Sequence, residues 1–146
     1  MALFQLERTV LLSPDDAWRR LTDWPAHGDV VPLTRVTVVT RPPAREGTVF
    51  VARTGLGPLG FDDRMEVTVW QPPSDGGPGR CRLDKRGRVV LGWAEIEVRP
   101  EPGGRTRVVW REDVRVRFLP SLFDPLLATA ARAMFGRAAD GLLRVR

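Results

Sequence analysis

Apolar residues along the chain recur with two different periods, and each period predicts a type of secondary structure. Residues 3–12 are rich in Leu, Val and Thr and predict a strand. The next four residues, Ser13-Pro14-Asp15-Asp16, combine an N-cap serine, a proline at the first helical position and an acidic residue placed as in a capping box. They predict a short helix, which Trp24-Pro25 ends, and a short helical or irregular stretch then continues to Pro32.

From Val36 onwards the apolar residues recur at every second position, which predicts strands. In the strand predicted at 61–70, one face carries Phe61, Asp63, Met65, Val67 and Val69. Residues 85–88 form a short link between two strands. The strands are separated by turns rich in Gly and Pro and are predicted at residues 36–40, 48–54, 61–70, 80–84, 89–98 and 105–118.

The C-terminal segment returns to a helical period. Asp124-Pro125 combines N-cap chemistry with a proline at the first helical position, and the helix is predicted to continue to about residue 144. Arg132, Gly136 and Asp140 lie opposite its apolar stripe. The stripe itself consists of Leu127, Ala131, Met134, Ala138 and Leu142.

This order of elements predicts an α+β fold. Strands joined by short turns pair antiparallel, and a sheet of this kind needs one covering layer, for which the C-terminal helix is the only element large enough. The chain has no internal repeat, low-complexity segment or shift in composition, so residues 1–146 are predicted to form a single domain.

The strand at 105–118 indicates where the chemistry lies. One face is rich in arginine and must be solvated, which sends Trp110, Glu112 and Val114 to the helix-covered side. Asp63 occupies a similar position on its own strand. Inward carboxylates must be paired or protonated, and two of them are candidates for an acid/base pair or for binding a polar ligand group. The alternatives are pairing with arginines, such as Arg53, or a position at a solvated rim.

In one predicted strand the alternation does not decide which face points inward. At residues 48–54, either the set with Phe50 or the set with Arg53 can point inward.

Residues 55–60 match the pattern GxGxxG, but a dinucleotide site needs a helix directly behind it. A strand pattern follows here, and Pro58 lacks one of the N–H groups, so the segment is predicted to be a turn.

Composition excludes several classes of function. Cys81 is the only cysteine, which excludes an intrachain disulfide and a CxxC site, and it alternates with arginines as a small core residue would. His27 is the only histidine, so zinc is not expected, and neither is any other metal or cofactor. No apolar run is long enough to span a membrane. Gln5, Glu7 and Arg8 interrupt the stretch a signal peptide would need, so a cytoplasmic location is expected.

The net charge of +5 arises from 23 basic and 18 acidic residues, and Lys85 is the only lysine among the basic ones. The dominance of arginine is typical of a GC-rich genome. Basic side chains crowd residues 80–117 but alternate with apolar residues, as on a solvated sheet face, so no nucleic-acid partner is predicted. An arginine-rich surface for a protein or nucleic acid stays the weakest hypothesis.

The chain resembles the START-like helix-grip superfamily, and within it the bacterial polyketide cyclase/dehydrase-like proteins. The resemblance spans essentially the whole chain and implies a curved antiparallel sheet of about six to seven strands wrapped around a long C-terminal helix, with two short helical segments after the first strand. The segments that carry it are the first strand leading into residues 13–18, Leu21-Thr22-Asp23, residues 32–36, Gly47 and residues 103–110.

In members of this superfamily a cavity between sheet and helix holds an apolar ligand, and the segment around His27 borders its mouth. The resemblance therefore implies that this chain binds a small, mostly apolar ligand such as a lipid or a polyketide. A cyclase/dehydrase-like enzyme that uses an inward carboxylate is the alternative. The family's pocket tyrosines have no counterpart here, so no catalytic residue is transferred. The candidate ligand-binding residues are Phe50, Asp63, Met65, Val67, Trp110, Glu112, Val114 and Met134.

Overall fold

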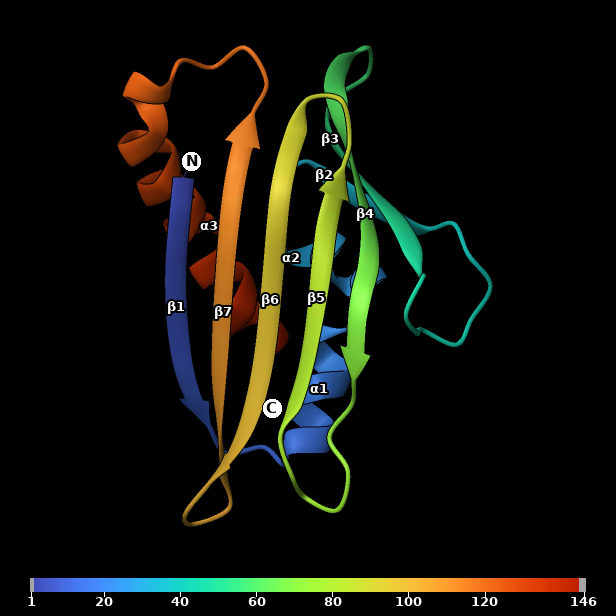
Figure 1. Cartoon of the computed structure of the whole chain (residues 1–146), viewed down its shortest axis with the longest axis vertical. Helices are drawn as coiled ribbons and strands as arrows, with labels where there is room; N and C mark the ends of the chain where they lie inside the picture. Colours follow the sequence, from blue (N-terminus) through green and yellow to red (C-terminus); the bar gives the residue numbers. More distant parts are fainter. Residues whose placement is uncertain (1, 145–146) are drawn as a thin grey trace.

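A seven-stranded antiparallel sheet forms the frame of the protein in a computed structural model, which describes residues 2–144. The first strand, β1 (Ala2–Val10), pairs with the last, β7 (Arg105–Val116), at one side of the sheet. The remaining strands follow in reverse chain order from there (Figure 1). They are β6 (Val90–Glu101), β5 (Gly79–Arg86), β4 (Leu59–Gln71), β3 (Val49–Leu56) and β2 (Thr34–Val38).

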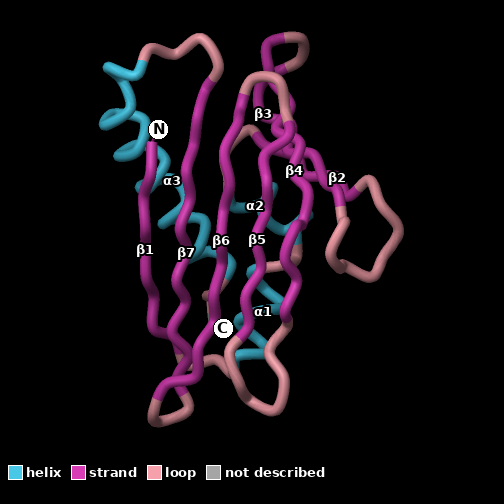
Figure 2. Tube along the Cα trace, viewed as in Figure 1, coloured by secondary structure: helices cyan, strands magenta, loops and turns pink. Residues whose placement is uncertain are grey.

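The helices all lie on one face of this sheet, so the fold has two layers (Figure 2). Two short helices, α1 (Pro14–Leu21) and α2 (Trp24–Val30), follow β1, and the long helix α3 (Asp124–Leu142) ends the described chain after a single 3-10 turn at Ser121–Phe123. This arrangement confirms the predicted helix-grip α+β fold. No helix in the described residues is both long enough and apolar enough to cross a membrane.

Side-chain caps mark the first turns of the two short helices. Ser13 is the N-cap of α1, and its hydroxyl accepts a hydrogen bond from the Asp16 amide at 3.1 Å. The Asp23 carboxylate caps α2 in the same way through the Ala26 amide. Trp24, at the start of α2, is buried against the sheet and stacks on Phe50 of β3 with ring centroids 4.6 Å apart.

A β-bulge in β4 overturns part of the predicted face of that strand. Val67 pairs with Leu83, but after it the register shifts, so that Val69 pairs with Arg82 on the outer face. Trp70 pairs with the buried Cys81 and lies on the inner face in place of Val69. One extra residue in a strand turns the following side chains to the other side of the sheet, so a strict period of two fails here.

The ends of two predicted strands were also wrong. β7 ends at Val116, and Phe118 is not on its inner face but 92% exposed, at a backbone φ of 70° that breaks the strand. Lys85 is not in a link, because β5 continues to Arg86 and carries Lys85 on the same inward face as Cys81 and Leu83. Two more residue pairs therefore extend the β5–β6 ladder beyond the predicted strand end.

Helix α3 has the predicted length to within two residues and packs inward through the predicted apolar stripe, but it has a different start, and its packing side also includes Gly136. Its N-cap is Phe123, and no side chain caps it. Gly136, expected opposite the apolar stripe, is buried, and a Cβ there would meet the guanidinium of Arg8 at 3.1 Å. The helix therefore lies against β1 through its glycine side, where Arg8 reaches Asp140 at 2.6 Å.

Candidate functional site

A cavity of about 320 Å³ lies between the inner face of the sheet and helices α2 and α3. Its walls come from every strand except β1 and are almost entirely apolar, with aromatic rings from Trp24, Phe50, Trp110 and Phe135. Alanines of α3 (Ala130 and Ala131) face it as well, so the small side chains of this helix leave room beneath it.

Seven of the eight candidate ligand-binding residues line this cavity. The exception is Val67, which is buried in the core, 1% exposed, but does not reach the cavity. His27 lines the cavity from α2. The seven are Phe50, Asp63, Met65, Trp110, Glu112, Val114 and Met134.

The structure also decides which face of β3 points inward. Phe50, Ala52 and Thr54 face the cavity, and the Thr54 hydroxyl is hydrogen-bonded to that of Thr34 at 2.9 Å. Arg53 points away and pairs with Asp62 at 3.3 Å. Arg53 is therefore not the partner of the inward carboxylates.

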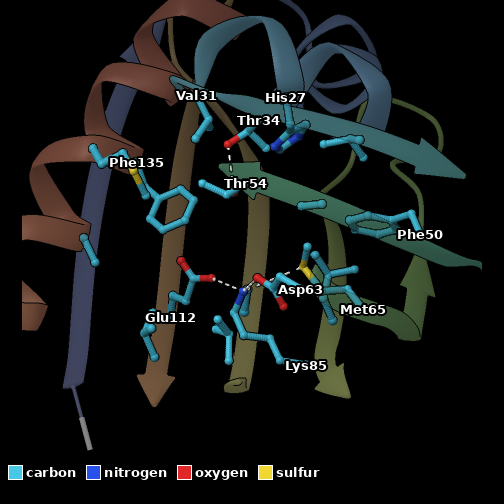
Figure 3. Close-up of a pocket in the computed structure, with 18 of the residues that line it drawn as sticks. His27, Val31, Thr34, Phe50, Thr54, Asp63, Met65, Lys85, Glu112 and Phe135 are labelled. Atoms are coloured by element: carbon cyan, nitrogen blue, oxygen red, sulfur yellow. Dashed lines mark hydrogen bonds and ion pairs between the residues drawn. The ribbon is translucent and has the colours of Figure 1, made fainter. Parts of the chain in front are cut away.

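That partner is Lys85, the residue that the sequence analysis missed. Its Nζ atom lies 2.7 Å from Oδ2 of Asp63 and 3.2 Å from Oε1 of Glu112, and the three side chains converge from β4, β5 and β7 (Figure 3). All three are nearly inaccessible, with side-chain exposures of 3% for Lys85, 14% for Asp63 and 2% for Glu112. We call these three residues the cavity triad.

Two signals in the sequence point to Lys85. It is the only lysine in a chain whose other basic residues are all arginine. It also continues the inward alternation of Cys81 and Leu83 on β5. Because the strand was predicted to end at residue 84, Lys85 was not assigned to its inward face.

Burial and charge decide the protonation of the triad. Desolvation by burial would lower the pKa of Lys85, but attraction to Glu112 and Asp63 outweighs it and raises that pKa above its ordinary value. For Glu112, desolvation outweighs the attraction to Lys85, so the pKa of Glu112 is raised. The triad therefore holds an ammonium, and Glu112 keeps its proton to a higher pH than a free glutamic acid.

Each carboxyl group has one oxygen left for a ligand. Oδ1 of Asp63 and Oε2 of Glu112 are buried, and neither has a hydrogen-bond partner among residues 2–144. The indole of Trp110 lies near Glu112 and slightly opposes the rise in its pKa, but its Nε1 also has no partner with hydrogen-bond geometry. Buried polar atoms without partners are costly, so these atoms mark the place where a polar group of a ligand can be accommodated.

His27 is held in a fixed position at the cavity wall. Its Nε2 atom lies 2.7 Å from the carbonyl oxygen of Leu21, and since a carbonyl only accepts, Nε2 carries the proton and donates. The ring packs between Trp24 and Trp110, with centroid distances of 5.5 and 5.9 Å. Burial lowers the pKa of His27, so the ring is neutral near pH 7.

Other chemical candidates lie outside the cavity or do not form a site. Cys81 is buried, and burial raises its thiol pKa to about 12, which makes it unreactive. The predicted turn within residues 55–60 is present as the two residues Gly57 and Pro58, which join β3 to β4. In the described part of the chain, no group of three His, Cys, Asp or Glu side chains could hold a metal ion.

The arginines of the outer sheet face are engaged with carboxylates. Glu95 lies within 3.1 Å of Arg80, 3.0 Å of Arg82 and 3.6 Å of Arg111. Arg111 also reaches Glu97 at 2.9 Å. This network across neighbouring strands is that of a solvated sheet face, because its positive charges are largely neutralised within the protein.

A curved antiparallel sheet that closes an apolar cavity against a C-terminal helix defines the helix-grip class of ligand-cavity proteins. The family described as polyketide cyclase / dehydrase and lipid transport matches residues 1–145, and the chain belongs to this family. A comparison with curated protein sequences gives no match.

Solved structures share the fold at low sequence identity. A START superfamily protein from Mycobacterium smegmatis is 13% identical with a TM-score of 0.73, and the match covers 97% of this chain and 96% of that one. An aromatase/cyclase from a Streptomyces species is 16% identical with a TM-score of 0.58, covering 96% and 85%. Norcoclaurine synthase from Thalictrum flavum is 16% identical with a TM-score of 0.61, covering 99% and 94%.

Proposed function

We propose that the protein binds a small, mostly apolar ligand in the cavity and holds one polar group of this ligand at the cavity triad. The observation that carries the proposal is the pair of unpartnered oxygens, Oδ1 of Asp63 and Oε2 of Glu112, in a cavity that is otherwise apolar. The volume of about 320 Å³ lies at the lower end of the range for small-molecule sites. Lipid transport in the family description is compatible with such a ligand.

The triad defines the chemistry of the polar group. A hydroxyl of the ligand donates to Oδ1 of Asp63, whereas Oε2 of Glu112 accepts from a hydroxyl when Glu112 is ionised and can donate to a carbonyl when Glu112 is protonated. A ligand with a hydroxyl or keto group on a hydrocarbon body satisfies these atoms, whereas a pure hydrocarbon leaves them unpaired at a cost of about 1–3 kcal/mol each. A ligand that is charged over most of its surface would lose its hydration against the apolar walls.

A second candidate function is catalysis of the cyclase/dehydrase kind, and the placement of two inward carboxyl groups on one ammonium favours it. Burial raises the pKa of Glu112, which makes it a better proton donor to a carbonyl oxygen than an exposed glutamate, and Asp63 is the carboxyl group placed to act as the base. The wall has no tyrosine to contribute, since the chain contains none. Binding and catalysis would use the same three side chains.

Native mass spectrometry of the purified protein tests the proposal. We expect an additional mass from a co-purified small molecule that is released on unfolding, and an E112Q variant that is folded but retains less of it. A matched control is Glu66→Gln, which removes an exposed carboxylate paired with Arg86. Equal ligand content in E112Q, E66Q and the wild type would contradict the role of the triad. Chemical change of the released molecule by the wild type but not by E112Q would favour catalysis over binding.

A further inference from the structure

The most exposed apolar side chains of the protein gather at one end of the molecule. Among the described residues, seven large apolar side chains are more than 60% exposed. One of them, Leu11, lies in the link between β1 and α1 at the opposite end. We call the other six the apolar rim: Leu33, Leu56, Leu59, Phe118, Leu122 and Leu126.

The sheet topology brings these six residues together from distant parts of the sequence. Leu56 and Leu59 flank the β3–β4 turn, and the Leu33 carbonyl accepts the Gly55 amide at 3.0 Å. Phe118 follows β7, whose C-terminal end lies at the same end of the antiparallel sheet as that turn. The β3–β4 turn, the β5–β6 turn and the link from β7 to α3 lie together at the top of Figure 1.

The cavity extends to this same end. Thr54, Phe61 and Leu127 line the cavity and lie one to two residues from the rim residues Leu56, Leu59 and Leu126. Phe61 is 38% exposed although it belongs to the cavity wall, so the wall reaches the surface there. The apolar rim therefore lies at the end of the molecule where the cavity wall reaches the surface.

Two exposed arginines lie beside the apolar rim. Arg88 in the β5–β6 turn and Arg117 after β7 are exposed, and the two turns are joined by a hydrogen bond from the Arg117 amide to the Val89 carbonyl at 2.7 Å. The Arg117 guanidinium lies over the ring of the rim residue Phe118, 5.7 Å from its centroid, so the charge is held beside the apolar rim. The whole chain carries +5. Apolar tips beside exposed arginines complement a surface that offers anionic groups above a hydrocarbon layer.

We propose that the apolar rim docks on anionic lipid bilayers and that the cavity exchanges its ligand with the membrane through this end. The inference rests on the proposed function, because only an apolar ligand needs a path that avoids water. Release into water exposes the apolar surface of such a ligand to water, whereas direct transfer into a bilayer keeps that surface in an apolar environment. Protruding tips from three separate segments suit a fluid bilayer better than the flat, packed face of a protein partner.

Co-sedimentation of the purified protein with vesicles tests the docking. We expect binding to phosphatidylcholine vesicles that contain a minority of phosphatidylglycerol, and weaker binding to pure phosphatidylcholine or at high salt. The double variant L59S/L122S should lose binding by at least about tenfold, since both side chains are 81% exposed and free to insert. The double variant R88Q/R117Q should lose about fivefold per arginine on anionic vesicles only.

The control is Leu11→Ser, which removes another highly exposed leucine, 69% exposed, from the other end of the molecule and should bind as the wild type does. Absence of vesicle binding, or equal losses in L11S and L59S/L122S, overturns the proposal. A wild-type dimer that L59S/L122S converts to a monomer, without vesicle binding, would identify the rim as a contact between two copies instead. The ligand content measured by mass spectrometry is independent of vesicles, so a protein that binds vesicles but never carries a ligand would contradict the proposed function and leave the docking intact.

Discussion

Lys85 and Glu112 meet across an intervening strand, with Nζ and Oε1 3.2 Å apart, although β5 and β7 are not neighbours in the sheet. Between them, β6 presents Gly92 opposite Lys85 and Ala94 opposite Glu112. These two residues carry at most one methyl group, so the long side chains on either side can close over the strand. The small residues of β6 are therefore part of the site, although they contribute no polar atom to it.

Removing the ammonium of the cavity triad should destabilise the protein strongly. Lys85→Met keeps much of the apolar stem but leaves two carboxyl groups buried without a counter-charge, and we expect a loss of about 3–5 kcal/mol near pH 7. The loss should shrink as the pH falls and Glu112, whose pKa is raised, takes up its proton. Urea unfolding at several pH values measures it. Arg86→Met, on the exposed neighbour, should change stability by about 0.5 kcal/mol or less, and an equal effect of both substitutions would contradict the role of Lys85.

The raised pKa of Glu112 predicts a pH dependence of stability with a definite sign. A group whose pKa is higher in the folded than in the unfolded state stabilises fully below the unfolded value, here 4.5, and loses that contribution as the pH rises through the folded value. The free energy of unfolding of the wild type, minus that of E112Q, should therefore decrease as the pH rises above about 4.5. Denaturant unfolding of both proteins across this range tests the sign. An increase would mean that the pKa of Glu112 is lower in the folded protein than in the unfolded chain.

Gly92 should tolerate no side chain. Its φ is +123°, and a Cβ would lie 1.9 Å from the carbonyl oxygen of Asp113, so that the β6–β7 ladder must separate. We expect Gly92→Ala to destabilise by about 3 kcal/mol or more, or to prevent folding. Gly103→Ala is the control, since φ there is +82° but nothing lies within 4 Å of the added Cβ. It should cost only about 1 kcal/mol, from the backbone conformation alone. Thermal unfolding of the two variants compares them, and equal losses would contradict the steric argument.

Cys81 should be inert in the folded protein. Its buried thiol has a pKa of about 12, so almost no thiolate, the reactive form, exists near neutral pH. A disulfide reagent such as dithionitrobenzoate should react many-fold more slowly with the native protein than with protein unfolded in urea. Because Cys81 is the only cysteine, the released chromophore reports this site alone. Rapid reaction of the native protein at neutral pH would show that the core around β5 opens readily.

The period of apolar residues determined the fold class, because burial of one face of a strand or helix requires a regular order of polar and apolar residues along the segment. It correctly sent Glu112 and Asp63 inward, ended the first strand before Ser13, and predicted the C-terminal helix to within two residues. The same local pattern could not anticipate the bulge after Val67, since an extra residue is accommodated by the partner strand and not by the sequence around it. It misplaced Val69 and Trp70 for this reason, whereas Phe118 was misplaced because β7 ends at Val116.

Only the tertiary structure decided what the inward carboxylates meet. Lys85 and Glu112 are 27 positions apart in sequence, and they come together because the register of two strand pairs, β5 with β6 and β6 with β7, places them on either side of Gly92 and Ala94. Alternation assigns a side chain to a face, but it carries no information on which residue of another strand lies beside it. The fold class was therefore available from local burial, whereas the chemistry of the cavity depends on register across the whole sheet.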